Sequence, residues 1–159
     1  MRQSFSEYST LEIASYVVQY AFDCSRPISN LSLQKILYFL QYASLVKFDK
    51  TINRDIEFEA WRYGPVVTEV YYHYRINGGC PVIPRKSGFN ETKHNEMKCA
   101  FEIFNQHMKD WLSFNTWSLV DISHKPGTAW AECYKEGENN IIPVDLIKQS
   151  DLKQELKLL

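Results

Sequence analysis

Three acidic side chains alternate along the chain between residues 55 and 59, and they are the first candidates for chemistry. They are Asp55, Glu57 and Glu59. Alternate side chains of a strand lie on one side, and clustered carboxylates can hold Mg²⁺ for hydrolytic chemistry. No lysine follows at the spacing of a metal nuclease, and alternation alone places charges on a solvated strand face. We favour a solvated face and keep a metal-dependent hydrolase as the alternative.

The histidines and cysteines form none of the spacings typical of metal sites or redox motifs. The sequence contains no H-x-x-x-H, H-E-x-x-H or C-x-x-C. A Cys–His nucleophile pair would meet only in the folded chain, so the sequence leaves it open. We expect no cofactor, and we expect small, buried cysteines in a reducing compartment. These residues are His73, His94, His107 and His124, and Cys24, Cys80, Cys99 and Cys133.

A tryptophan, an arginine and a tyrosine occur together at the junction of the predicted strand and a turn. Trp61, Arg62 and Tyr63 are the residue types most enriched in binding hot spots. The alternative is a structural corner in which Trp61 is packed. Arg62 would then pair with Glu59 or Glu57. The sequence does not decide between a contact surface and a corner.

His124 differs from the other histidines in its surroundings. It lies between the end of a predicted helix and a Pro-Gly turn, close to Thr128 and Trp130. A contact with a partner is one interpretation. The favoured alternative is a cap at the C-terminus of that helix, where histidine stabilises the last carbonyl groups.

Two helices are predicted in the first third of the chain. Ser9 and Glu12 have the spacing of a capping box and open the first helix. Ser29 or Asn30 caps a second helix that runs to about Lys47, and apolar side chains cover nearly its whole circumference. A helix of this kind is buried on several sides, so we place it at the centre of the fold.

The hydrophobic period changes to two from Asp55 onwards, which predicts a strand. Pro65 is well placed as the first residue of the next helix. The short segment at residues 80–84 contains two prolines and is expected to be an edge strand. We therefore expect a small antiparallel hairpin between strands at Phe58 and Val82.

The second half of the chain is predicted to be helical after a polar loop at residues 85–93. One helix carries apolar residues in register up to Met108, and shorter helices open at Asn115, Thr128 and Pro143. The last residues are expected to fray. The whole pattern predicts an α+β, predominantly helical fold, with about seven helices around the helix of residues 33–43.

Length and composition predict a single domain spanning residues 1–159, because no linker interrupts the pattern. The 18 basic and 19 acidic residues leave a net charge of −1, which argues against nucleic-acid binding driven by bulk charge. The N-terminus is polar, so we expect no signal peptide, and no apolar run reaches the roughly 18 residues of a membrane span. We expect a cytoplasmic protein without nucleic-acid or membrane partners.

Three blocks of the sequence follow a known pattern. They are LQKILYFLQ at residues 33–41, FEAWRYGPVV at 58–67 followed by EVY at 69–71, and the weaker SHKPGTAW at 123–130. In this order and spacing, the chain resembles the Panacea domain family, also called SocA-like, of phage-associated antitoxins from bacterial toxin–antitoxin pairs. The first two blocks together are quite specific.

The resemblance implies a compact, mainly helical domain that neutralises a cognate toxin by direct protein–protein contact, without an active site or cofactor. It also implies that a bacterial protease can be a further partner, because at least one member delivers its toxin to one as an adaptor. Some members carry an added DNA-binding module, which we do not expect here because the single predicted domain accounts for the 159 residues.

Five residues are our candidates for contact with the toxin, and each could equally be a packing residue. Trp61 and Trp130 would be apolar anchors, Arg62 a charged contact, Tyr63 an amphipathic anchor and His124 a polar contact. Two alternatives stay open: a phage-associated interaction or proteolytic-adaptor protein without a toxin, and the metal-dependent hydrolase at the alternating carboxylates. The sequence does not identify the toxin or the oligomeric state.

Overall fold

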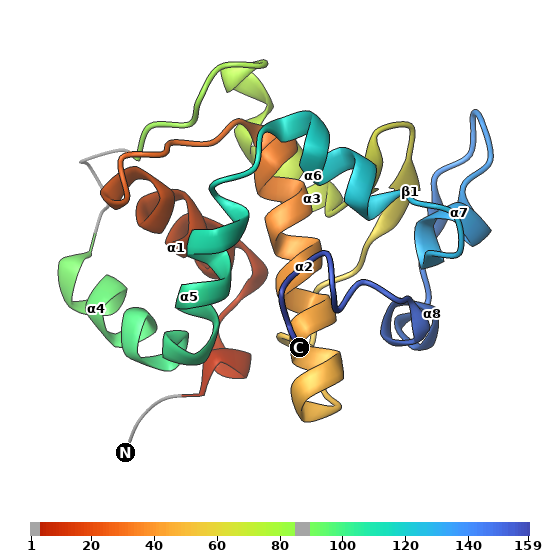
Figure 1. The fold of residues 1–159 in the computed structure, drawn as a ribbon. Helices are drawn as coiled ribbons and strands as arrows, with labels where there is room; N and C mark the ends of the chain where they lie inside the picture. Colours follow the sequence, from red (N-terminus) through yellow and green to blue (C-terminus); the bar gives the residue numbers. More distant parts are fainter. Residues whose placement is uncertain (1–3, 85–89) are drawn as a thin grey trace.

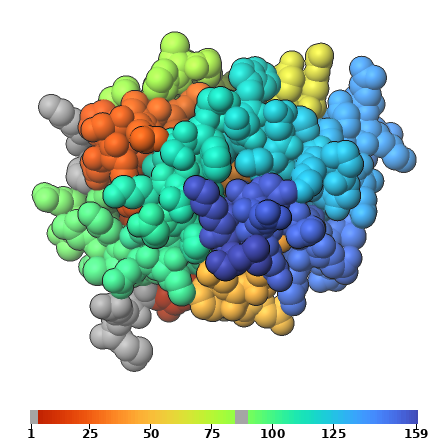
Figure 2. All heavy atoms as spheres, in the orientation of Figure 1, coloured from red at the N-terminus to blue at the C-terminus, as the bar shows by residue number. Residues whose placement is uncertain are grey.

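Helix α2 (Asn30–Phe48) runs through the middle of the computed structural model, which describes residues 4–84 and 90–159 (Figure 1). The Ser29 side chain caps its first turn by accepting a backbone hydrogen bond. Nearly all of its side chains are buried. In Figure 2, viewed from the same side, other segments cover α2 except near its C-terminal end. The predicted central helix is confirmed.

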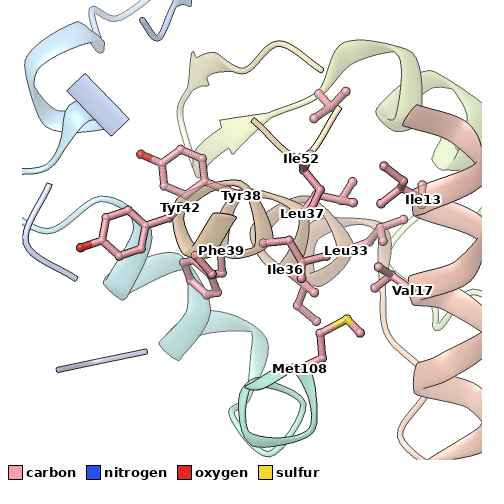
Figure 3. Packing of buried hydrophobic residues seen from close by; sticks show 14 of the residues in the cluster. Ile13, Val17, Leu33, Ile36, Leu37, Tyr38, Phe39, Tyr42, Ile52 and Met108 are labelled. Carbon is pink, nitrogen blue, oxygen red and sulfur yellow. The ribbon is translucent and has the colours of Figure 1, made fainter. Parts of the chain in front are cut away.

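Other helices pack against α2 from several sides and form the apolar core with it. Figure 3 shows Leu33 and Leu37 of α2 directed toward Ile13 and Val17 of the neighbouring α1. Burial of such apolar area is the main stabilising contribution to a fold of this kind. The helices in contact with α2 include α1 (Thr10–Asp23), α5 (Glu102–Trp111), α6 (Thr116–Ser123) and α8 (Val144–Gln149).

Helices α4 (Glu91–Ala100) and α5 replace the one continuous helix predicted up to Met108. The chain turns at Phe101, whose φ of −93° and ψ of 7° are not helical. The Phe101 ring is fully buried and stacks on Tyr16 of α1, with ring centroids 4.9 Å apart. Packing of this ring against α1 decides the break, and the apolar register along the sequence does not contain that information.

The polar loop predicted at residues 85–93 lies partly outside the described residues, which exclude 85–89. Its last part is helical instead. Asn90 caps α4 by accepting a hydrogen bond from the Lys93 backbone N–H at 2.9 Å. The cap was available in the sequence, but the polarity of the stretch concealed it.

A small antiparallel sheet lies beside the N-terminal half of α2 (Figure 1). Its strand order is β2-β1-β3, so the last strand in the chain pairs with the first. Ala60 at the centre faces Pro65 on one side and Asn140 on the other. The strands are β1 (Glu59–Trp61), β2 (Gly64–Val66) and β3 (Asn140–Ile141).

The hairpin exists, but the predicted pairing with Val82 is wrong. Val82 donates its backbone N–H to Ile28 O at 2.8 Å instead. Pro65 lies within β2 and does not open a helix; its missing N–H is tolerated because β2 is an edge strand. The next helix, α3 (Thr68–Tyr74), begins three residues later and continues into a 3-10 turn, η2 (Arg75–Asn77).

The shorter helices begin where the sequence predicts. Asn115 caps α6, Thr128 caps α7 (Ala129–Cys133), and Pro143 precedes α8. In all, the described residues contain eight α-helices and the three short strands. The fold is therefore α+β and predominantly helical, as predicted.

The C-terminal segment packs back onto the core, so the predicted fraying is wrong. The Tyr42 hydroxyl donates to Ser150 O at 2.7 Å and accepts from the Leu152 N–H at 3.0 Å. The Trp111 indole donates to Leu156 O at 3.1 Å. These two buried aromatic side chains are far from the C-terminus in sequence, so local polarity does not reveal the contact.

Candidate functional site

Two polar side chains of α2, Gln34 and Lys35, are buried against the β-hairpin. Lys35 Nζ donates a hydrogen bond to Pro65 O at 2.7 Å. Gln34 Oε1 accepts one from the Val67 N–H at 2.9 Å. These side chains satisfy one backbone group within the edge strand β2 and one directly after it. The hairpin is thereby fixed to the central helix.

The Lys35 ammonium group is fully buried, and among the described residues it has no carboxylate partner. Burial lowers the pKa of Lys35 to about 7, because a low-dielectric interior disfavours the charged form. Gly64 lies so close that an added Cβ would be 2.7 Å from Lys35 Cε and 2.6 Å from Ser123 Oγ. With a φ of +107° as well, this position requires glycine.

Arg62 and Tyr63 form the tip of the hairpin and project from this fixed base. Tyr63 is 45% exposed, and its ring meets Trp117 of α6 edge to face at 5.5 Å between centroids. The Arg62 guanidinium lies over the Tyr63 ring at 5.3 Å. Trp117 is itself 58% exposed. We call these three side chains the tip face.

Behind the tip lie three residues that contact one another, Trp61, Trp130 and His124. The Trp130 indole donates to Trp61 O at 2.7 Å, which joins α7 to β1. Trp130 stacks on Tyr134 with centroids 4.6 Å apart, and the His124 ring lies 4.9 Å from Trp130. His124 is also the C-cap residue of α6. The fold thus brings all five candidate residues into one region.

The sequence left two interpretations of this region open, a structural corner and a contact surface, and the structure assigns them to different residues. Trp61 is half-buried, and its indole donates to Glu59 Oε2 at 3.3 Å, as expected for a corner. Arg62 is exposed and forms no ion pair within the described part of the chain, so the predicted pairing with Glu59 or Glu57 is not found. Trp61 is thus packed, whereas Arg62 and Tyr63 are exposed.

A groove of about 300 Å³ lies between the hairpin and the α3–η2 segment. Trp61 and Tyr71 meet edge to face within it, 4.9 Å apart between centroids. Arg62 lines one wall and Arg75 the other. The groove is continuous with the tip face through Arg62 and Tyr63, so both belong to one candidate contact surface.

Comparison with known proteins assigns the chain to a family. The profile of the family described as "Antitoxin SocA-like, Panacea domain" matches residues 33–131. This chain belongs to that family. The antitoxin SocA of Caulobacter vibrioides (strain NA1000 / CB15N) is 38% identical over 73 residues, which cover 46% of this chain and 38% of that protein. No solved structure matches the chain.

The structure explains why two sequence blocks of this Panacea domain occur together. The block at residues 33–41 supplies Gln34 and Lys35, and the block at residues 58–67 supplies the backbone groups that they bind. The matched region begins within α2 and ends within α7, so it omits β3 and α8. The candidate contact surface lies inside the matched region.

The alternating carboxylates do not lie together on one strand face in this Panacea domain. Strand β1 begins at Glu59, so Asp55 and Glu57 precede the strand and do not share a face of it with Glu59. Within residues 4–84 and 90–159, no group of three His, Cys, Asp or Glu side chains is arranged to hold a metal ion. The predicted strand face is therefore wrong for two of the three residues.

The cysteines also differ from the prediction. All four are free, but Cys80 and Cys99 are exposed, and Cys24 and Cys133 are only partly buried. Cys24 and Cys133 pack partly against the hydrophobic core, and only to this extent do they act as small apolar residues.

In the part of the chain that the structure describes, no helix has the length and hydropathy needed to cross a membrane.

Sequence reasoning missed Gln34, Lys35, Tyr71, Arg75 and Trp117. A usable signal existed for the first two, because a helix buried on all sides leaves no solvated position for a glutamine or a lysine. The segment from Tyr71 to Arg75 is rich in aromatic residues and was another signal. Nothing in the sequence indicated that Trp117 would meet Tyr63, since that contact depends on how α6 packs.

Proposed function

We propose that this Panacea domain is an antitoxin that neutralises a cognate toxin by direct contact, and that the contact is centred on the tip face. The observation that carries the proposal is the contrast between a fixed base and an exposed tip. Lys35 holds the base through Pro65 O. Tyr63 and Trp117 remain about half exposed at the tip.

An exposed aromatic pair beside an arginine is well suited to protein recognition. Tyrosine, tryptophan and arginine contribute most of the energy in many interfaces. A contact held in place before binding loses less conformational entropy when the partner docks. The tip face meets both conditions, because its backbone is anchored to α2 and its side chains already touch one another.

We infer that Trp130 and His124 position the tip and contribute less to the contact itself, and that Trp61 takes part in this positioning through its backbone carbonyl. Trp61 and Trp130 are joined by the indole-to-carbonyl hydrogen bond, and His124 packs on Trp130. We further infer a non-enzymatic role in the bacterial cytoplasm, with the toxin as the main partner. The family description as antitoxin SocA-like supports this inference.

The proposal is tested with the gene adjacent to this one in its source genome. That gene is expressed alone, with the wild-type chain, and with an Arg62→Ala/Tyr63→Ala variant. We expect growth arrest by the neighbour, rescue by the wild type with co-purification, and loss of both with the variant. Loss of affinity of at least about tenfold is expected for two hot-spot residues.

The matched control removes an exposed arginine and an exposed aromatic ring from outside the hairpin, as Arg54→Ala/Phe22→Ala. Thermal melting must show that both double variants are folded. A harmless neighbour, or a rescue that the tip variant retains in full, would contradict the proposal. Rescue that requires a host protease and removes the toxin would indicate the adaptor mechanism in place of simple neutralisation.

A further inference from the structure

Two arginines line the groove beside the hairpin, and the Glu59 carboxylate, which accepts a hydrogen bond from the Trp61 indole, is not part of the lining. Its lining among the described residues includes Arg62, Arg75, Trp61, Tyr71 and Val66, and no Asp or Glu. The chain as a whole has a net charge of −1. The groove is therefore locally positive although the net charge of the chain is slightly negative. The overall composition does not predict this local charge.

Both arginines are available to a partner. Each is exposed, and each guanidinium lies over a tyrosine ring: Arg62 over Tyr63 at 5.3 Å and Arg75 over Tyr72 at 5.4 Å. Neither forms an ion pair with a carboxylate in the described part of the chain. A guanidinium over an aromatic ring keeps its N–H groups free for a planar acceptor, so both can still bind carboxylates.

A chain of side-chain amides fixes the two walls of the groove to α2. Gln34 Oε1 binds the Val67 N–H on the hairpin side, at 2.9 Å. Gln34 Nε2 donates to Asn30 Oδ1 at 2.9 Å, and Asn30 Nδ2 donates to Tyr71 O at 3.1 Å on the α3 side. The groove is thus formed before any partner binds, which lowers the entropic cost of binding.

We propose that this groove binds an acidic segment of the partner protein, with carboxylates on Arg62 and Arg75 and an apolar side chain against Trp61 and Tyr71. The proposal rests on the antitoxin function above and names the chemistry of the toxin surface that is recognised. A nucleic acid fits less well, because two arginines on a chain with a net charge of −1 offer few contacts to phosphates.

The test uses short random peptides displayed on phage. Peptides that bind the full chain are selected, and those that also bind an Arg62→Gln/Arg75→Gln variant are removed. The control variant is Arg54→Gln/Lys153→Gln, which removes the same charge from exposed positions outside the groove. We expect enriched peptides that combine Asp or Glu with an apolar residue. We expect them to bind the groove variant at least about tenfold more weakly, since charge-assisted hydrogen bonds are lost.

Synthetic versions of the enriched peptides, and analogues with Asn and Gln in place of Asp and Glu, are then measured by fluorescence anisotropy. The analogues should lose the same affinity. The proposal is overturned if no groove-dependent peptide is enriched, if the enriched peptides lack carboxylates, or if they bind the groove variant as well as the control. A single-stranded oligonucleotide that displaces the peptides and binds more tightly would also overturn it.

The peptide selection does not use the toxin, so its result is separate from that of the rescue assay. If the wild type fails to rescue growth but peptides still bind in a groove-dependent way, the antitoxin function is refuted. The groove then remains a binding site for acidic segments. Full rescue by the Arg62→Gln/Arg75→Gln variant would show that the toxin does not use the groove. The assignment of the groove to the toxin would then be withdrawn.

Discussion

The β-hairpin has a buried side and an exposed side, and the two are built from different interactions. On the buried side, Lys35 binds the backbone of Pro65 in β2, and Gln34 binds the backbone of Val67 directly after β2. On the exposed side, the Arg62 guanidinium lies over the Tyr63 ring, and the Tyr63 ring meets Trp117 edge to face. We conclude that the buried side positions the hairpin and the exposed side is available for binding. Substitutions on the two sides should therefore change different measured quantities.

The largest effect on stability is expected for Gly64→Ala. The new Cβ would approach Ser123 Oγ and Lys35 Cε within 2.7 Å at a φ of +107°. Strain and overpacking together should lower the free energy of unfolding by about 3 kcal/mol. Gly127→Ala is the control, because it also has a positive φ but meets no atom within 4 Å. Urea denaturation that gives equal losses for both variants would contradict close packing at Gly64.

The next effect is a pH dependence that Lys35 produces and Lys35→Met removes. The folded pKa is about 7 and the unfolded pKa is 10.5, so between these values the unfolded state binds more protons. The free energy of unfolding should therefore rise with pH in that window, by up to about 1 kcal/mol per pH unit. Below pH 7 both states are protonated and the slope disappears. Parallel curves for wild type and Lys35→Met between pH 7 and 9 would contradict a buried, unpaired ammonium.

A smaller loss of stability is expected for Trp130→Phe. This change keeps an aromatic ring but removes the indole N–H that donates to Trp61 O at 2.7 Å. The expected cost is about 1 kcal/mol. Trp117→Phe is the control, and it should be almost neutral because Trp117 is 58% exposed. Thermal melting of both variants would show whether Trp130 is mainly a positioning residue; equal melting temperatures would contradict that role.

The smallest effect on stability is expected at the tip itself. Tyr63→Ala should change the free energy of unfolding by less than about 0.5 kcal/mol, since the ring is 45% exposed. The same variant should weaken binding of the partner. Chemical denaturation and a binding titration on the same preparation measure the two quantities. A variant that unfolds easily would show that Tyr63 belongs to the buried side, and the comparison drawn above would fail.

Local sequence signals predicted helix starts well and long-range contacts poorly. Ser9, Asn115 and Thr128 cap helices as expected, because a cap depends only on residues one turn away. The partner of β1 was predicted at Val82 and lies in β2 and β3 instead. Strand pairing depends on turn geometry and on distant segments, and neither is contained in the hydrophobic period.

In the candidate site, too, local features were predicted from the sequence and long-range contacts were not. The residue types at positions 61–63 indicated a binding region from sequence, because hot-spot composition is a local property. Tyr71 and Arg75 were missed, because their relevance depends on the groove that α3 forms with the hairpin. The choice between corner and contact for Trp61 and Arg62 also required the fold, since burial of each side chain depends on what packs against it.

The sequence by itself determined the helical character of this Panacea domain, its central helix and the family to which it is similar. These properties follow from hydrophobic periodicity, caps and short motifs, which act over a few residues. Only the tertiary structure decided that Gln34 and Lys35 hold the hairpin, that the C-terminus is packed, and that two arginines share one groove. Each of these depends on contacts between residues far apart in the chain, where packing and burial select the partners.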